Sequence, residues 1–195
     1  MKELIFASHN QGKIKELREM LAPLNIKVLS ADDMSLPDVE ETGTTFEENA
    51  ILKAKTISVL TKMPVLADDS GLCVDALDGR PGVYSARYAP NRNFDLAMDM
   101  LLKELDEAAN PSRAAHFSCV LALCFPNGEK VCFEGRVDGT IANQKSGSAG
   151  FGFDPIFIPS GYDLTFAELG SEIKNRISHR GRALQKLAVY LKAQG

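Results

Sequence analysis

Short apolar runs alternate along this chain with longer segments in which apolar residues recur at helical spacing. Leu4–Ala7, Ile26–Leu29 and Val65–Ala67 have the length and composition of buried strands. Between the first two runs, apolar residues at positions 14, 17, 21 and 24 have the spacing of an amphipathic helix, and Pro23 marks its end. This alternation favours an α/β fold, because parallel strands need long crossover connections that are usually helices.

The second half of the chain adds a hairpin to this pattern. Phe117–Phe125 and Val131–Val137 flank a turn that contains Asn127-Gly128, a strong hairpin signal. A helix over Asn93–Ala108 is expected to turn Leu96, Met100, Leu101 and Leu105 inward, and a C-terminal helix has its buried stripe at Ala183, Leu184, Leu187 and Leu191. We therefore expect one α/β domain over residues 1–195, with a mixed central sheet flanked by helices and two lobes around a cleft.

Charge and composition exclude several classes of protein. The 22 basic and 26 acidic residues give a net charge of −4, whereas polyanion-binding domains are usually basic, so we expect no nucleic-acid partner. The longest apolar run, Cys119–Phe125, is far shorter than the roughly 18 residues of a membrane span. The four cysteines all lie in apolar runs without a C-x-x-C pair, which predicts inert, buried thiols. We expect a cytoplasmic protein with no membrane partner.

A polar loop joins the first predicted strand to the first predicted helix. Its sequence is Ser8-His9-Asn10-Gln11-Gly12-Lys13. A helix N-terminus attracts anions, and Lys13 adds a full positive charge in the first turn. The loop is not a P-loop, because Ala7 and Ile14 stand where that motif needs Gly and Ser or Thr. From the pattern alone, an anion site and a capped helix with a solvated lysine are equally good interpretations.

Two acidic clusters are the candidates for metal or base chemistry. They are Glu40-Glu41-Thr42-Gly43 and Asp68-Asp69-Ser70-Gly71, the second placed where the strand at 65–67 is expected to end. Adjacent carboxylates repel each other unless they are solvated, protonated or metal-bound, and hard oxygen ligands suit Mg²⁺. The alternatives are a polar turn for the second cluster and a solvated loop for the first.

Four further groups have both a functional and a structural interpretation. Asn49 and Lys53 share a helix face, which by itself is typical of a surface pair. Arg80–Tyr88 mixes cations with aromatics and could bind a base or phosphate, or simply pack as a loop. Gly150–Pro155 could be a stacking platform with a polar handle, or a tight turn whose aromatics face the core. Lys174, Ser178, His179 and Arg180 form a basic cluster with donors suited to a keto oxygen.

Taken together, these segments resemble the inosine/xanthosine triphosphate pyrophosphatase family, which acts on non-standard purine nucleoside triphosphates. The resemblance covers residues 4 to 184 in order. It is carried by Ser8–Lys13, Glu40–Ala50 with Lys53-Ala54, Ala67–Leu72, Gly79–Tyr88, Phe151–Pro155 and Ile177–Gly181. It implies an elongated α/β homodimer that binds a nucleotide in its cleft. It also implies Mg²⁺-dependent hydrolysis of ITP, dITP and XTP to the monophosphate and pyrophosphate. Such an enzyme would remove deaminated purines from the nucleotide pool.

The resemblance also implies roles for individual residues. Asp69 would be the proton acceptor and a metal ligand, Glu41 and less surely Glu40 would support the metal, and Lys13 would assist catalysis. The substrate would be bound by Ser8, His9, Asn10, Gln11, Gly12, Lys13, Lys53 and Ser70, mainly at its phosphates, and at its base end by Phe151, Gly152, Phe153, Asp154, Lys174, His179 and Arg180.

Physical chemistry agrees with these roles but leaves alternatives open. A donor from His179 or Arg180 would pair with a 6-keto purine and be left unpaired by adenine, which costs about 1–3 kcal/mol per group. Guanine also has a 6-keto group, so rejection of GTP must involve its 2-amino group. A pyrophosphatase for another modified nucleotide remains an alternative, as does a regulatory module that binds nucleotide without cleaving it.

Overall fold

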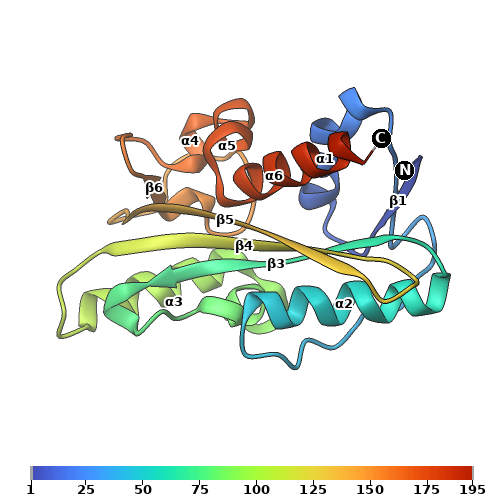
Figure 1. The fold of residues 1–195 in the computed structure, drawn as a ribbon. Coiled ribbons are helices and arrows are strands. Elements are labelled where there is room, and N and C mark those ends of the chain that lie inside the picture. Colours follow the sequence, from blue (N-terminus) through green and yellow to red (C-terminus); the bar gives the residue numbers. More distant parts are fainter. Residues whose placement is uncertain (1, 195) are drawn as a thin grey trace. The chain divides into compact units, whose positions relative to one another are not determined.

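The computed structural model describes residues 2–194 (Figure 1). The chain forms two compact units. The first unit comprises the chain up to Asp69, residues Cys119–Gly135 and the chain from Arg182 onward. The second comprises Ser70–Ser118 and Arg136–Gly181. The expectation of one domain over residues 1–195 stays a prediction.

One six-stranded sheet runs in the order β2-β1-β3-β4-β5-β6. Its strands are β1 (Glu3–Phe6), β2 (Lys27–Ser30), β3 (Val65–Val74), β4 (Ala114–Cys124), β5 (Lys130–Ile141) and β6 (Phe157–Pro159). β1 is parallel to β2 and to β3, whereas β5 is antiparallel to β6. The expectation of an α/β fold with a mixed sheet is therefore confirmed.

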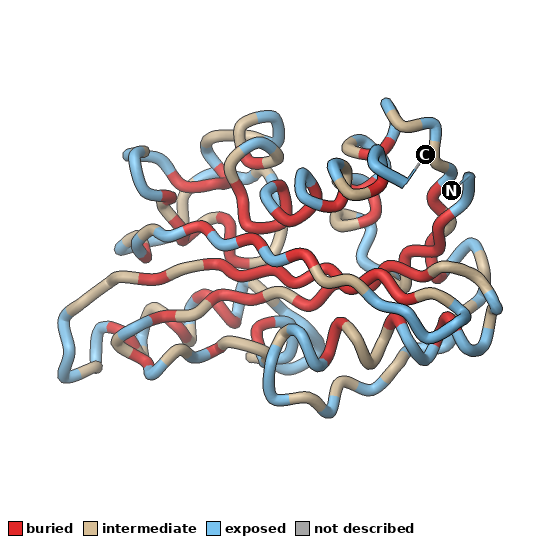
Figure 2. The backbone as a smooth tube through the Cα atoms, viewed as in Figure 1, coloured by how far each residue is buried: buried red, intermediate tan, exposed pale blue. Residues whose placement is uncertain are grey.

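The first unit packs helices on both faces of its strands. These helices are α1 (Gln11–Leu21), α2 (Phe46–Thr61) and most of α6 (His179–Ala193). Successive residues of a strand point to opposite faces. Accordingly, Leu4 and Phe6 pack in a core with α1 and α6, while Ile5 packs in a second core with α2. Figure 2 shows the resulting runs of buried residues along the strands.

The second unit has a single apolar core. It is built on α3 (Phe94–Glu107) together with the short helices α4 (Phe166–Leu169) and α5 (Ser171–Ile177). Ala97, Met98, Leu101 and Leu105 of α3 are buried in this core, as predicted for the last two. Leu96 was expected to face inward and is instead 42% exposed, so that prediction is wrong. Ala97 and Met98 form the buried face at this point, which rotates Leu96 out to solvent.

The free cysteines agree only in part with the prediction of buried thiols. Cys119 and Cys124 are buried, whereas Cys73 and Cys132 are only half-buried. Burial raises the pKa values of the Cys73, Cys124 and Cys132 thiols, which lowers their thiolate fraction at neutral pH.

The acidic sequence Asp68-Asp69-Ser70-Gly71 lies inside a strand. The expected strand end at Ala67 is wrong, since β3 continues without interruption to Val74. The polar-turn interpretation is therefore wrong as well. Both carboxylates are buried, and strand geometry points them to opposite faces of the sheet. The extended backbone is compatible with this burial because each carboxylate has polar partners, which are described next.

Candidate active site

The loop from Ser8 to Lys13 connects β1 to the first turn of α1, as the sequence predicted. Asn10 is the N-cap of α1, and its side-chain Oδ1 accepts the backbone N–H of Lys13 at 3.1 Å. The Oγ of Ser8 accepts the backbone N–H of Asn10 at 3.2 Å. These contacts fix the loop in a tight turn at the helix N-terminus, where backbone N–H groups and the helix dipole favour an anion.

Lys13 contacts a buried carboxylate. Its Nζ lies 2.9 Å from Oδ2 and 3.2 Å from Oδ1 of Asp68, whose side chain is only 1% exposed. The interpretation of Lys13 as a merely solvated lysine therefore does not hold. Because Asp68 is so deeply buried, removing the lysine would leave a nearly desolvated negative charge. The pair holds the ammonium group in place beside the loop.

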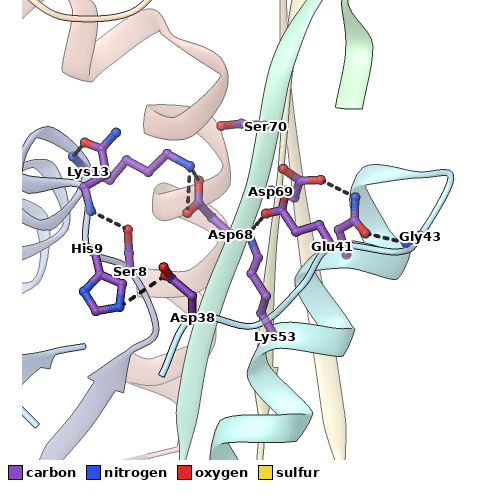
Figure 3. Close-up of polar contacts among 12 residues, drawn as sticks. Ser8, His9, Lys13, Asp38, Glu41, Gly43, Lys53, Asp68, Asp69 and Ser70 are labelled. Carbon is purple, nitrogen blue, oxygen red and sulfur yellow. Dashed lines mark hydrogen bonds and ion pairs between the residues drawn. The ribbon is translucent and has the colours of Figure 1, made fainter. Parts of the chain in front are cut away.

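Asp69 points to the opposite face of β3 and contacts residues of α2 (Figure 3). The Nδ2 of Asn49 donates to Asp69 Oδ2 at 2.9 Å. Burial raises the pKa of Asp69 to about 6; the Glu41 charge also raises it, while Lys53 and the Asn49 hydrogen bond oppose the shift. A carboxyl group with this pKa is largely ionised at neutral pH and still basic enough to accept a proton.

Asn49 is a residue whose importance the sequence pattern concealed. It was expected to form a surface pair with Lys53, but it is completely buried in α2, and that interpretation is wrong. Its Oδ1 accepts the backbone N–H of Gly43 at 2.7 Å while its Nδ2 donates to Asp69. A Cβ on Gly43 would lie 2.7 Å from this Oδ1, so glycine is needed for the close approach. The i, i+4 spacing from Lys53 was the one signal of a shared role.

Lys53 reaches the same group of carboxylates from one turn further along α2. Its Nζ donates to Glu41 Oε1 at 2.5 Å. Burial lowers the pKa of Lys53, but the charges of Asp68, Glu41 and Asp69 outweigh burial and raise it. Lys53 is therefore a fixed cation among three carboxylates.

Glu41 and Asp69 are the residues that could hold a magnesium ion. Among residues 2–194, no three His, Cys, Asp or Glu side chains converge closely enough to hold a metal by themselves. Mg²⁺, however, is usually held by one or two carboxylates together with substrate phosphates and water. Glu41 and Asp69 are close enough for the Glu41 charge to shift the Asp69 pKa, and they supply such a pair. Glu40 is exposed to solvent.

The second unit contains a buried ion pair beneath an aromatic ring. Lys174 Nζ donates to Asp154 Oδ2 at 2.7 Å, and both side chains are 3% exposed. The backbone N–H of Phe151 donates to the same Oδ2 at 2.9 Å. Lys174 Nζ also lies 4.1 Å from the centre of the Phe151 ring, which is a cation–π distance. The turn is thus organised around Asp154, which makes it a rigid support for Phe151.

Two basic residues, His179 and Arg180, lie at the start of α6 and contact polar and aromatic side chains of the second unit. Arg180 Nη2 donates to Ser70 Oγ at 2.9 Å, and its guanidinium carbon lies 5.5 Å from the Phe151 ring centre. His179 stacks on Phe117 with ring centres 4.6 Å apart and an interplanar angle of 10°. Both basic residues are buried. Phe117 is a further member of this group that the sequence motifs did not reveal.

Phe153 has a different environment from Phe151. It is 2% exposed in the core of the second unit and makes an edge contact with Phe94 at 5.5 Å. This placement favours the core-facing interpretation for Phe153 and leaves Phe151, which is only partly buried, as the aromatic available for stacking. Gly152 adopts a φ of +65° between them, a conformation that favours glycine.

The Arg80–Tyr88 segment is anchored to α3 through Glu104. Tyr88 Oη donates to Glu104 Oε1 at 2.6 Å, and Arg80 Nη1 donates to Glu104 Oε2 at 2.9 Å. An open pocket of about 430 Å³ lies beside Arg80 and Glu104. These contacts favour the packed-loop interpretation for Arg80 and Tyr88.

The structure therefore assembles the predicted residues into two groups. In the first unit these are Ser8–Lys13, Glu41, Lys53 and Asp69; in the second they are Ser70, Phe151–Asp154, Lys174, His179 and Arg180. Asp32, which follows β2 and contacts His9 and Gln11, was not singled out from the sequence. Its signal was its place after a strand parallel to β1, since the carboxyl ends of parallel strands share an edge.

This chain is similar to known proteins over nearly its whole length. The model of the Ham1 family matches residues 4–190. A Bacillus licheniformis protein named dITP/XTP pyrophosphatase is 51% identical over 193 residues, which is 98% of each chain. A Bacillus subtilis protein of the same name is 49% identical over 195 residues, covering 99% of this chain and 98% of the relative.

This chain is also similar to solved structures over nearly its whole length. A HAM1 protein from Coxiella burnetii is 43% identical with a TM-score of 0.92, covering 99% of this chain and 100% of the other. A nucleoside-triphosphatase / dITP/XTP pyrophosphatase from Mycobacterium abscessus is 41% identical with a TM-score of 0.76, covering 95% and 98%. Within residues 2–194, no helix is long and apolar enough to cross a membrane.

Proposed function

The chain belongs to the Ham1 family, and we propose that it is a pyrophosphatase that hydrolyses dITP, ITP and XTP to the monophosphate and pyrophosphate. This membership bears out the resemblance found in the motifs. The observation that carries the proposal is the Asp69 site: a buried carboxylate with its pKa raised to about 6, hydrogen-bonded by Asn49 and close to Glu41 and Lys53.

Asp69 is proposed to accept the proton of the attacking water. Hydrolysis to a monophosphate and pyrophosphate requires attack at the α-phosphorus, and water is a weak nucleophile until a base removes its proton. Asn49 fixes one carboxylate oxygen, Oδ2, through its 2.9 Å hydrogen bond. This hydrogen bond restrains the orientation of the whole carboxylate group, as near-attack geometry requires.

Glu41 and Asp69 are the residues proposed to hold Mg²⁺. When bound, the ion would neutralise phosphate charge and lower the pKa of coordinated water. Lys53, which donates to Glu41, keeps that carboxylate in place and limits the repulsion between the two acidic side chains.

Lys13 is proposed to stabilise the leaving pyrophosphate. Its ammonium is held by Asp68 next to the loop Ser8–Lys13, whose helix N-terminus favours phosphate oxygens. Charge develops on the leaving group during the reaction, so a preorganised cation lowers the barrier more than it strengthens substrate binding.

Residues of the second unit are proposed to bind the purine. The Phe151 ring offers an aromatic face for stacking, and the guanidinium of Arg180 offers donors for the 6-keto oxygen of hypoxanthine or xanthine. Adenine has an amino group at this position, which cannot accept these donors. Rejection of adenine nucleotides therefore follows from an unpaired buried donor, which costs about 1–3 kcal/mol.

The physiological role proposed is removal of deaminated purine nucleotides from the pool, by a homodimer in the cytoplasm. A nucleotide-binding regulatory module is disfavoured, because three carboxylates around Lys53 would repel a bound triphosphate unless they serve a metal or a proton transfer.

Pyrophosphate release tests this function. ITP, dITP, XTP, GTP and ATP are each incubated with the protein in Mg²⁺, with EDTA as the control. Release from ITP, dITP or XTP well above that from GTP and ATP, and none in EDTA, supports the proposal. Binding without release identifies the regulatory module, and a preference for another modified nucleotide identifies the related pyrophosphatase.

A further inference from the structure

Two residues that follow β2, Ala31 and Asp32, form hydrogen bonds with the loop Ser8–Lys13. The backbone N–H of Ala31 donates to the carbonyl oxygen of Ser8 at 3.3 Å. One residue later, the two oxygens of the Asp32 carboxylate accept from two different loop side chains. His9 Nδ1 lies 2.5 Å from Oδ1, and Gln11 Nε2 lies 2.9 Å from Oδ2.

The two residues that contact Asp32 lie on either side of Asn10, the N-cap of α1. His9 and Gln11 flank Asn10, whose side chain caps α1 by accepting the Lys13 N–H. A carboxylate that engages both neighbours restricts the backbone on either side of Asn10. The N–H groups at the start of α1 are then held in one orientation before any ligand arrives, which reduces the ordering cost of binding.

The negative charge of Asp32 allows a positioning role to be distinguished from a purely electrostatic one. A carboxylate close to an anion-binding loop repels phosphate, so on electrostatic grounds alone its removal should tighten phosphate binding. Positioning acts in the opposite direction, because an unrestrained loop must be ordered when the ligand binds. The sign of the effect therefore separates the two roles of Asp32.

We propose that Asp32 is a positioning residue that holds the loop Ser8–Lys13 in its phosphate-binding shape through His9 and Gln11. This inference rests on the proposed function, in which that loop binds the triphosphate. Asp38 gives weaker support from the same segment, since its Oδ1 lies 3.4 Å from His9 Nε2 and its side chain is 84% exposed (Figure 3).

The chain provides a matched control at the next residue. Asp33 is also an acidic, partly exposed side chain of this segment, but it accepts from the Ser30 backbone N–H at 2.8 Å and from Arg18 at 2.7 Å. Asp32→Asn and Asp33→Asn therefore make the same change in net charge and shape, but only the first alters the contacts of His9 and Gln11.

The test measures KM and kcat for ITP in Mg²⁺, and the Kd of ITP by calorimetry in EDTA. For Asp32→Asn we expect KM and Kd to rise three- to tenfold with kcat within twofold of wild type. For Asp33→Asn both constants should stay within about 1.5-fold. A partly unfolded variant would lose kcat without a change in KM, so this split distinguishes positioning from a loss of folded protein.

A second variant tests whether Asp32 affects KM through its contacts with His9 and Gln11. Asp32→Asn should have little further effect on KM in a protein that already carries His9→Ala and Gln11→Ala, because the contacts it acts through are gone. An unchanged or lower KM and Kd for Asp32→Asn would overturn the inference, as would an equal rise in Asp33→Asn. If wild type binds ITP without cleaving it, the proposed function fails while the Kd comparison still tests Asp32; absence of ITP binding overturns both.

Discussion

Replacing Asp69 by Asn should abolish turnover and at the same time stabilise the folded protein at neutral and alkaline pH. The carboxyl group has a pKa of about 6 in the folded protein, against its ordinary value of 3.8. The difference of roughly 2.2 units corresponds to about 3 kcal/mol at about 1.36 kcal/mol per unit. Because burial is the main cause of the shift, ionised Asp69 destabilises the fold by up to this amount, and the neutral amide of Asn does not.

The sign of the pH dependence follows from the raised pKa. Between pH 3.8 and about 6 the folded state binds more protons at this site than the unfolded state. The cost is therefore fully present above the folded pKa and lost as the pH falls towards the unfolded value. The shift already includes the opposing attraction to Lys53, so about 3 kcal/mol is the net difference that the variant should gain at most.

Urea unfolding at pH 8 and at pH 4 measures this effect. Asp69→Asn should exceed wild type in its free energy of unfolding at pH 8, and the difference should shrink towards zero at pH 4. Asp163→Asn is the control, because Asp163 is exposed and the same loss of charge should change little. Equal or lower stability of Asp69→Asn at pH 8, or near-normal turnover, would refute the reasoning.

Three other substitutions test the remaining parts of the site. Lys13→Ala should reduce kcat for ITP at least tenfold and lower the free energy of unfolding by up to about 3 kcal/mol, since Asp68 loses its ion pair with Lys13 while the charge of Lys53 remains nearby; unchanged kinetics would exclude Lys13 from catalysis. Lys174→Met should cost about 3–5 kcal/mol in urea unfolding by leaving Asp154 buried without its ammonium partner, and a loss below 1 kcal/mol would contradict the pairing. Arg180→Met should lower the ratio of kcat/KM for ITP over ATP about tenfold, and an unchanged ratio would remove Arg180 from base recognition.

Much of the fold could be predicted because local patterns and tertiary packing agree. The capping box at Thr45 starts α2, and the helical stripe that includes Leu187 is buried in α6, as their spacing indicated. The exceptions arise where tertiary contacts override local preference. Asp68 and Asp69 look like a turn in sequence, yet they remain in an extended strand because Lys13 and Asn49 reach them from two different helices.

The candidate site could be predicted where its chemistry lies within one motif. The loop before α1 and the turn around Asp154 are of this kind. Asn49 and Asp32 could not be identified in this way, because each acts by joining segments that are distant in sequence. Asn49 links Gly43 to Asp69, and its spacing from Lys53 indicated only a shared helix face and neither of these contacts.

Hydrolysis of ITP in ¹⁸O-labelled water, followed by mass spectrometry of the products, tests the central claim most directly. Attack of water at the α-phosphorus places the label in IMP and leaves pyrophosphate unlabelled. The account predicts this distribution for wild type in Mg²⁺ and no product from Asp69→Asn. Label in pyrophosphate, or formation of IDP and phosphate, would contradict it.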